Sequence, residues 1–366
     1  MSVTPFRIAI DDQDVEDLKA RLRATRFSQV APNEEFERGP SSAYLHDLAT
    51  DWADLDWRAA EAELNTLDQV LVEVGGTTLH SIHVRSPRPD AVPIVLLHGW
   101  PDTAFRYRHL VPLLAEPEGE GPAFHVVVPS LPGFGFSGRT AANADDTADL
   151  VAGLMTELGH ERFVVAGGDV GTNVGLALGR RHADRLHGLF LTNVSYPTGQ
   201  EQDLTEAERE YADYIQGWWY RECAYAMVQS TKPQIVGPAL ADSPIGMAAF
   251  MLGLIETGAE GHDVDGAFGG RHELLVNLSL YWLTNTAASA ADTYHAESST
   301  WGGETARVEV PTGVAIFPRE APSPREWCER QADVVRYTRM PRGGHFAALE
   351  VPHDLTAELR AFVADL

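Results

Sequence analysis

The chain has 366 residues, of which 44% are hydrophobic and 22% charged, a composition typical of globular proteins. Its 28 basic and 53 acidic side chains give a net charge of −25, which argues against nucleic acid and anionic membrane surfaces as partners because both would repel it. Two cysteines, Cys223 and Cys328, are too few for a disulfide framework or a multi-cysteine metal site. The first residues lack a secretion signal and no apolar run reaches the ~18 residues that span a bilayer, so we expect a soluble, cytoplasmic protein.

The first 198 residues change from a helical to an alternating pattern. Residues 1–66 carry apolar side chains at helical spacing, and the run 70–84 alternates about Gly75-Gly76, which predicts a β-hairpin. Strand and helix patterns then alternate, with a helix that begins near Asp146-Thr147. Short apolar strands are expected at 93–97, 124–128, 162–166 and 189–192. This rhythm predicts an α/β fold with a mostly parallel, doubly wound sheet.

The strand rhythm stops after residue 198 and returns near the end of the chain. Helical patterns dominate 199–300, which predicts a helical insertion over the sheet. Strand signals reappear at 314–317 and 334–338, before a last amphipathic helix at 352–366. The predicted organisation is an N-terminal extension with the hairpin, a first part of the core, a helical cap and a second part of the core, at 1–90, 91–198, 199–300 and 301–366.

The segment Gly167-Gly168-Asp169-Val170-Gly171 lies between a predicted strand and helix. It has the G-x-nucleophile-x-G form of a nucleophile elbow, with aspartate at the position that esterases give to serine. A glycine-rich loop in which Asp169 only caps the helix fits the pentapeptide equally well. The surrounding sequence favours the nucleophile elbow, because candidates for the catalytic acid and base follow Asp169 along the chain in the order that α/β hydrolases use.

Those further residues follow three predicted strands. His98-Gly99-Trp100-Pro101 comes after a buried strand, where the backbone N–H groups of Trp100 and Val170 would form an oxyanion hole. Glu320 follows the strand at 314–317, and His345 follows the last strand. Nucleophile, acid and base thus occur in the order expected of an α/β hydrolase, although a solvated Glu320 and a structural His345 remain alternatives.

Two motifs that could indicate a cofactor or a metal lack the neighbouring features that such sites need. Gly133 to Gly138 match G-x-G-x-x-G, but prolines precede the motif and no helix start follows to hold a pyrophosphate. His80 and His83 have an odd separation on a predicted strand and therefore face opposite sides. We expect neither a cofactor nor a metal.

An aspartate nucleophile indicates the reaction class. Attack on saturated carbon gives an alkyl ester that water can open at its carbonyl, whereas a serine would give an inert ether. Cleavage of an epoxide C–O bond or of a carbon–halogen bond is therefore expected. An epoxide oxygen needs acid assistance, for which Tyr225 and Tyr294 in the insertion are candidates.

Many segments together resemble the microsomal-type epoxide hydrolase family of the α/β-hydrolase superfamily. They are Trp57 to Asn65, Leu79 to Arg85, His98 to Pro101, Pro132 to Ser137, Gly167 to Gly171, Gln229 to Pro233, Ala239 to Pro244, Tyr281-Trp282, Pro311 to Pro318 and Pro341 to Glu350. The resemblance implies Asp169 as nucleophile, His345 as base, Glu320 as orienting acid, and Tyr225 and Tyr294 as the pair that protonates the epoxide oxygen. The membrane anchor of vertebrate relatives is absent, which implies a soluble version.

The sequence thus predicts an epoxide hydrolase that forms a vicinal diol without a cofactor. A haloalkane or haloacid dehalogenase on the same scaffold is the alternative, although Val170 stands where haloalkane relatives usually have tryptophan. A catalytically dead ligand-binding relative is disfavoured by the intact acidic and basic residues. The expected partner is a small hydrophobic epoxide, with no nucleic acid and no membrane, and the sequence leaves a homodimer open.

Overall fold

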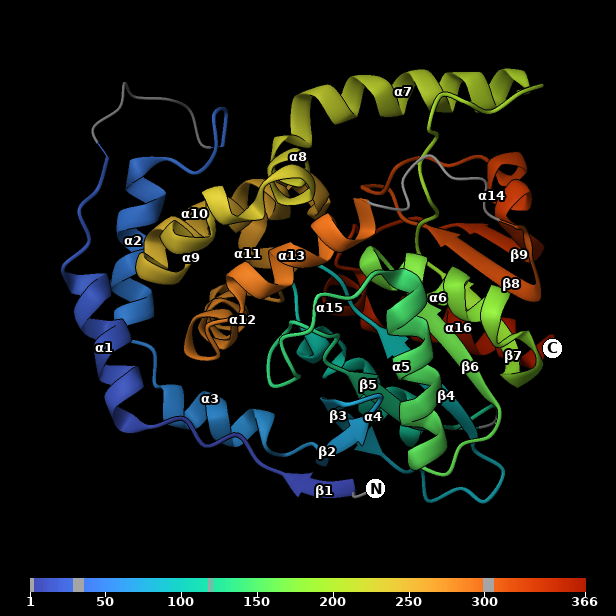
Figure 1. Ribbon diagram of the computed structural model, residues 1–366, viewed down its shortest axis with the longest axis horizontal. Helices are drawn as coiled ribbons and strands as arrows, with labels where there is room; N and C mark the ends of the chain where they lie inside the picture. The colour runs from blue at the N-terminus through green and yellow to red at the C-terminus, as the bar shows by residue number, and fades with distance from the viewer. Residues whose placement is uncertain (1–2, 29–35, 118, 120, 299–305) are drawn as a thin grey trace.

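The computed structural model describes residues 3–28, 36–117, 119, 121–298 and 306–366 (Figure 1). Within these residues nine strands form one sheet in the order β1-β2-β3-β5-β4-β6-β7-β8-β9. Strands β4 to β9 are parallel to one another, whereas β1, β2 and β3 pair antiparallel and β3 joins β5 antiparallel. The strands are β1 Val3–Phe6, β2 Gln69–Val74, β3 Thr77–Val84, β4 Val92–Leu97, β5 Phe124–Pro129, β6 Phe163–Gly167, β7 Leu186–Leu191, β8 Val308–Ile316 and β9 Ala332–Arg339.

The parallel strands are apolar on both faces because helices cover both. In β4, Val95 and Leu97 belong to one buried cluster and Ile94 and Leu96 to another, as the two-residue period of a strand requires. Helices α5 (Ala144–Glu157) and α6 (Val170–Arg181) contribute to the first cluster, and α4 (Leu110–Ala115) and α16 (Pro352–Ala364) contribute to the second. The predicted doubly wound α/β fold is therefore confirmed.

Two local expectations differ from the structure. The N-terminal region holds a strand as well as helices: β1 pairs with β2, but its four mostly exposed residues carry too little apolar pattern to reveal a strand. Helix α5 is capped by Asn143, whose side chain accepts the Asp146 N–H at 2.9 Å, so the helix begins before the predicted Asp146-Thr147. The predicted hairpin is present, and Gly75 and Gly76 have φ of 58° and 83°, as its tight turn demands.

Between β7 and β8 the described residues form helices without a strand. We call α7 to α13 the cap helices. Figure 1 shows them on one side of the sheet, with α7 running from α8 across the top of the view toward α14 (Arg325–Gln331). Residue 300 lies outside the described residues, so the limits of 199 and 300 stay a prediction. The helices are α7 Glu206–Glu222, α8 Ala224–Thr231, α9 Gly237–Asp242, α10 Pro244–Gly258, α11 Val264–Ala267, α12 Arg271–Leu283 and α13 Ala287–Ser298.

The N-terminal helices α1 (Asp12–Arg23) and α2 (Ser42–Ala53) pack against the cap helices (Figure 1). Helix α3 (Trp57–Leu64) instead contributes to the second buried cluster, on the face of the sheet that α4 and α16 cover. The buried Trp52 indole donates to Ser279 Oγ of α12 at 2.8 Å. The extension is thus bonded to the cap.

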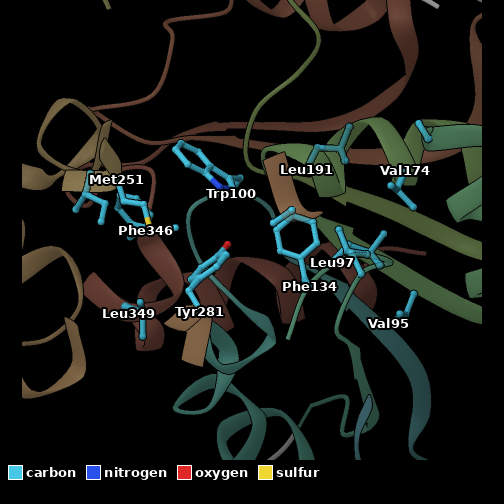
Figure 2. Packing of buried hydrophobic residues seen from close by; sticks show 14 of the residues in the cluster. Val95, Leu97, Trp100, Phe134, Val174, Leu191, Met251, Tyr281, Phe346 and Leu349 are labelled. Carbon is cyan, nitrogen blue, oxygen red and sulfur yellow. The ribbon is translucent and has the colours of Figure 1, made fainter. Parts of the chain in front are cut away.

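The core continues from the sheet into the cap. Figure 2 shows Trp100, Phe134 and Tyr281 together with the strand residues Val95 and Leu97, all members of one buried cluster. The Phe134 and Tyr281 rings meet edge to face at 6.4 Å. Sheet and cap therefore share a continuous apolar interior. None of the helices described here combines the length and apolar character needed to cross a membrane.

Candidate active site

Asp169 lies on a sharp turn between β6 and α6, with φ of 57° and ψ of −127°. This backbone conformation is rare for a residue other than glycine and is found where a site requires it. A side chain at Gly171 would collide with the Leu97 backbone carbonyl, so the close packing of helix and strand requires glycine there. The Asp169 side chain makes no capping bond to α6, which removes the alternative of a simple helix cap.

Backbone N–H groups hold the Asp169 carboxylate. The Trp100 N–H donates to Oδ1 at 2.9 Å, and the Val170 N–H lies near enough to lower the pKa of the same carboxyl. Gly99 passes so close that a side chain there would overlap the Asp169 carboxylate. The Asp169 N–H donates to Asn193 Oδ1 at 3.0 Å, which fixes the turn from the neighbouring strand end. The two N–H donors expected from the sequence thus converge on one group.

His345 stands between the two acidic side chains. Its Nε2 lies 3.7 Å from Asp169 Oδ2 and its Nδ1 lies 2.7 Å from Glu320 Oε1, a close contact whose geometry departs from an ideal hydrogen bond. The side chains of His345 and Asp169 each keep 17% of their surface accessible, whereas Glu320 keeps 3%. Solvent can therefore contact the first two groups but hardly the third.

The charges of this trio shift its proton equilibria. Burial by itself would lower the pKa of His345, but the carboxylates of Glu320 and Asp169 outweigh it and raise that pKa to about 9. Burial raises the pKa of the Asp169 carboxyl, against the opposing effects of His345 and the N–H groups of Trp100 and Val170.

Tyr225 of α8 and Tyr294 of α13 face this trio from the cap. The Tyr225 ring stacks on the Trp100 indole at 5.3 Å, and the Tyr294 ring stands edge-on to the same indole at 6.2 Å. The two phenol rings are 6.0 Å apart, and their hydroxyls are within hydrogen-bonding reach of each other. Burial, and then the charge of Asp169, raises both phenol pKa values well above the ordinary 10.0, so both hydroxyls stay protonated as donors.

The structure adds supporting groups that sequence reasoning missed. Asn193 follows β7, and a polar residue at a parallel strand's carboxyl end could have marked it. The His345 N–H donates to the Gly258 carbonyl of the cap at 2.9 Å, a backbone contact that leaves no sequence signal. The Gly133–Gly138 motif closes on itself through a Gly133 N–H bond to the Gly138 carbonyl, and the next helix begins only at Ala144. Among the described residues, no group of three or more His, Cys, Asp or Glu side chains is arranged to hold a metal.

The sheet order and the strand–turn–helix elbow define an α/β hydrolase, and a family model described as "alpha/beta hydrolase fold" matches residues 92–235. A second model, "Epoxide hydrolase N terminus", matches residues 3–107. The chain is 38% identical to a protein of Stigmatella aurantiaca (strain DW4/3-1) that is named as an epoxide hydrolase, over 98% of this chain and 84% of that protein. It is 32% identical to epoxide hydrolase 1 of Sus scrofa, over 99% of this chain and 88% of the relative.

A solved structure agrees over the whole chain. The epoxide hydrolase of Aspergillus niger superimposes with a TM-score of 0.88 at 32% identity, and the match covers 100% of this chain and 97% of that one. The chain therefore belongs to the epoxide hydrolase family and is an enzyme of that family.

Proposed function

We propose that the enzyme converts a small hydrophobic epoxide into a vicinal diol through an alkyl ester on Asp169. The observation that carries the proposal is the placement of the Asp169 carboxylate between the His345 base and two protonated phenols. Aromatic side chains around it, including Trp100 and Phe250 with rings 5.9 Å apart, favour an apolar substrate. Two chemical steps follow from this arrangement.

The first step forms the ester. The free Asp169 oxygen attacks one epoxide carbon, the carbon–oxygen bond of the ring breaks, and the released alkoxide takes a proton from the phenol pair. Tyr225 and Tyr294 suit this task because both remain protonated beside the carboxylate. His345 is not needed as a base in this step.

The second step opens the ester. His345 takes a proton from water, and the resulting hydroxide attacks the Asp169 carbonyl carbon while Glu320 orients the ring and stabilises the imidazolium. The N–H groups of Trp100 and Val170 hold the oxyanion of the tetrahedral intermediate. Collapse breaks the bond between the carbonyl carbon and the alkyl oxygen, which takes the proton of the newly added hydroxyl as the diol leaves and Asp169 returns to a carboxylate. The histidinium proton restores the phenol.

The dehalogenase alternative is less well supported by the same residues. A departing halide needs N–H donors rather than acids, and Val170 supplies no side-chain donor at the position after the nucleophile. Two phenols with raised pKa values match an alkoxide leaving group better, since an alkoxide must gain a proton.

A single turnover in water enriched in heavy oxygen tests the proposal. Solvent oxygen should enter the Asp169 carboxylate and not the diol, because water attacks the ester carbonyl. Mass spectrometry of the peptide that contains Asp169 checks this, and in His345→Gln the intact protein should gain the mass of the epoxide. Label found only in the diol would rule out the ester and indicate direct attack by water on the epoxide.

A further inference from the structure

A buried ion pair links the two loops that the proposed second step uses. Asp102 follows the loop that supplies the Trp100 N–H, and its Oδ1 accepts the Gly99 N–H at 3.2 Å. Its Oδ2 is paired with Arg106 Nη1. Arg106 Nη2 donates to the backbone carbonyl of His345 at 2.7 Å. Three successive contacts therefore connect the oxyanion-binding loop with the base, although 239 residues separate Arg106 from His345.

The guanidinium has little freedom in this position. Arg106 is 5% exposed and Asp102 is 1% exposed, and the Phe346 ring lies under the guanidinium at 5.8 Å. A planar fork can hold the Asp102 carboxylate and the His345 carbonyl at once, whereas an ammonium on a flexible stem suits only one of them well. Burying two charges is costly enough that apolar residues often stabilise a fold equally well, so stability alone does not account for the pair.

We propose that Asp102 and Arg106 are positioning residues, which hold His345 in register with the Trp100 N–H and serve the hydrolysis of the ester rather than its formation. The inference rests on the proposed function. Hydrolysis needs the His345 ring, a water molecule and the carbonyl of the Asp169 ester in one fixed arrangement, with the oxyanion on the Trp100 N–H. Ester formation needs the Asp169 carboxylate and the two phenols, none of which the bridge contacts.

The cap holds the same two loops from the other side. Tyr281 of α12 donates its hydroxyl to the Asp102 backbone carbonyl at 2.7 Å, and Asn277 donates to the Pro101 carbonyl at 3.0 Å. Gly258 accepts the His345 N–H, as described above. The Asp102–Arg106 bridge is thus a direct core link between two loops that the cap also holds, through two different helices.

The test separates positioning from the removal of a buried charge. In the double variant Asp102→Asn with Arg106→Met, both charges are removed together, so no unpaired charge is left in the core. We expect ester formation within about threefold of the parent rate, and ester hydrolysis slowed about 10- to 100-fold, the scale of a misplacement near 1 Å. Rapid-quench mass spectrometry, which counts protein that carries the epoxide mass, measures both rates, and the esterified enzyme should accumulate.

Arg106→Lys is the second variant and retains the positive charge. It should also slow hydrolysis, and its pH profile should keep the parent midpoint. Four charged groups act on the His345 ring or its loop. Glu320 and Asp169 raise the pKa of His345, and Arg106 lowers it. Glu350 lies near the ring and accepts the Gly344 N–H. In the double variant, loss of the Arg106 charge should move the hydrolysis midpoint to higher pH. A general loss of structural integrity would slow both chemical steps together, whereas a positioning role slows hydrolysis alone and leaves the midpoint of Arg106→Lys at the parent value.

The control is the ion pair of Arg330 with Glu208, whose carboxylate side chain is only 2% exposed and which lies away from both loops. Arg330→Met with Glu208→Gln should leave both chemical rates unchanged. The inference is overturned if the double variant or Arg106→Lys hydrolyses the ester at the parent rate, or if both steps slow equally. Failure of the parent enzyme to label Asp169 would instead contradict the proposed function, so the two failures are distinguishable.

Discussion

At the residue scale, the charge of Asp169 controls the strength of the proposed base. In the free enzyme the Asp169 and Glu320 carboxylates outweigh burial and raise the pKa of His345 to about 9. Formation of the proposed ester would remove the charge of Asp169, so one of the two causes of the rise would disappear. The pKa of His345 should then fall toward physiological pH, so that the ring is a free base at the proposed step that needs one.

Glu320→Gln tests this electrostatic coupling. Without the Glu320 charge, the pKa of His345 should fall from about 9 toward its ordinary 6.5. Histidine C2–H resonances followed against pH measure the shift. The control is Glu329→Gln, which removes an exposed carboxylate that pairs with Arg325. An unchanged His345 titration in Glu320→Gln would contradict the coupling.

The same shift predicts how stability depends on pH. The folded-state pKa exceeds the unfolded value, so the stabilisation is fully present below pH 6.5 and is lost as pH rises through about 9. It amounts to about 3 kcal/mol at most, from 1.36 kcal/mol per pKa unit. Urea titrations between pH 6 and 10 should show a smaller loss of stability in Glu320→Gln than in the parent. Equal losses would argue against His345 as the responsible group.

At the element scale, the strand periods and the loops after strands explain why much of the site can be predicted. Asp169, Glu320 and His345 each follow a strand, and parallel strands bring their carboxyl ends to one edge. Composition and period alone leave Tyr225 and Tyr294 among ten tyrosines, and only the family resemblance selects them. The structure brings all five side chains together.

Other features depend on contacts that no local pattern encodes. Asp102 and Arg106 have the four-residue spacing of a common surface pair, and nothing in the sequence marks them as buried or bonded to the His345 carbonyl. Strand β1 is mostly exposed and forms because its backbone pairs with the edge strand β2. Tertiary context therefore decides the elements with the weakest patterns.

Helices α8 and α13 pack together, and we expect Tyr225 and Tyr294 both to stabilise the alkoxide that forms when the epoxide opens. Each helix supplies one phenol, so Tyr225→Phe or Tyr294→Phe should each slow ester formation by about 10²-fold, near 3 kcal/mol, and the double change should slow it further. Ester hydrolysis should change much less. Stopped-flow tryptophan fluorescence can follow ester formation, with the half-exposed Tyr214→Phe as the control. Unimpaired ester formation in the double variant would favour the dehalogenase alternative.

At the scale of the whole molecule, the N-terminal extension reaches the site through the cap. Trp52 of α2 bonds Ser279 of α12, and the same helix carries Asn277 and Tyr281, which hold the loop of Trp100. Arg21 of α1 bonds Asp242 at the end of α9. A contiguous set of contacts therefore runs from the extension through α12 to the oxyanion-binding loop.

This continuity predicts that loss of Trp52 loosens α12 selectively. Trp52→Ala removes a side chain that is 1% exposed together with its bond to Ser279, and should cost about 3–5 kcal/mol of unfolding free energy. Trp57→Ala is the matched control, because Trp57 is 3% exposed but belongs to the cluster on the opposite face of the sheet. The free energy of unfolding should fall by a similar amount in Trp57→Ala.

The two variants should differ in hydrogen exchange. Exchange in residues 271–283 should rise much more in Trp52→Ala than in Trp57→Ala, because Trp52, and not Trp57, bonds a residue of that helix. Equal exchange in the two variants would mean that the extension stabilises the fold as a whole and has no separate hold on the cap.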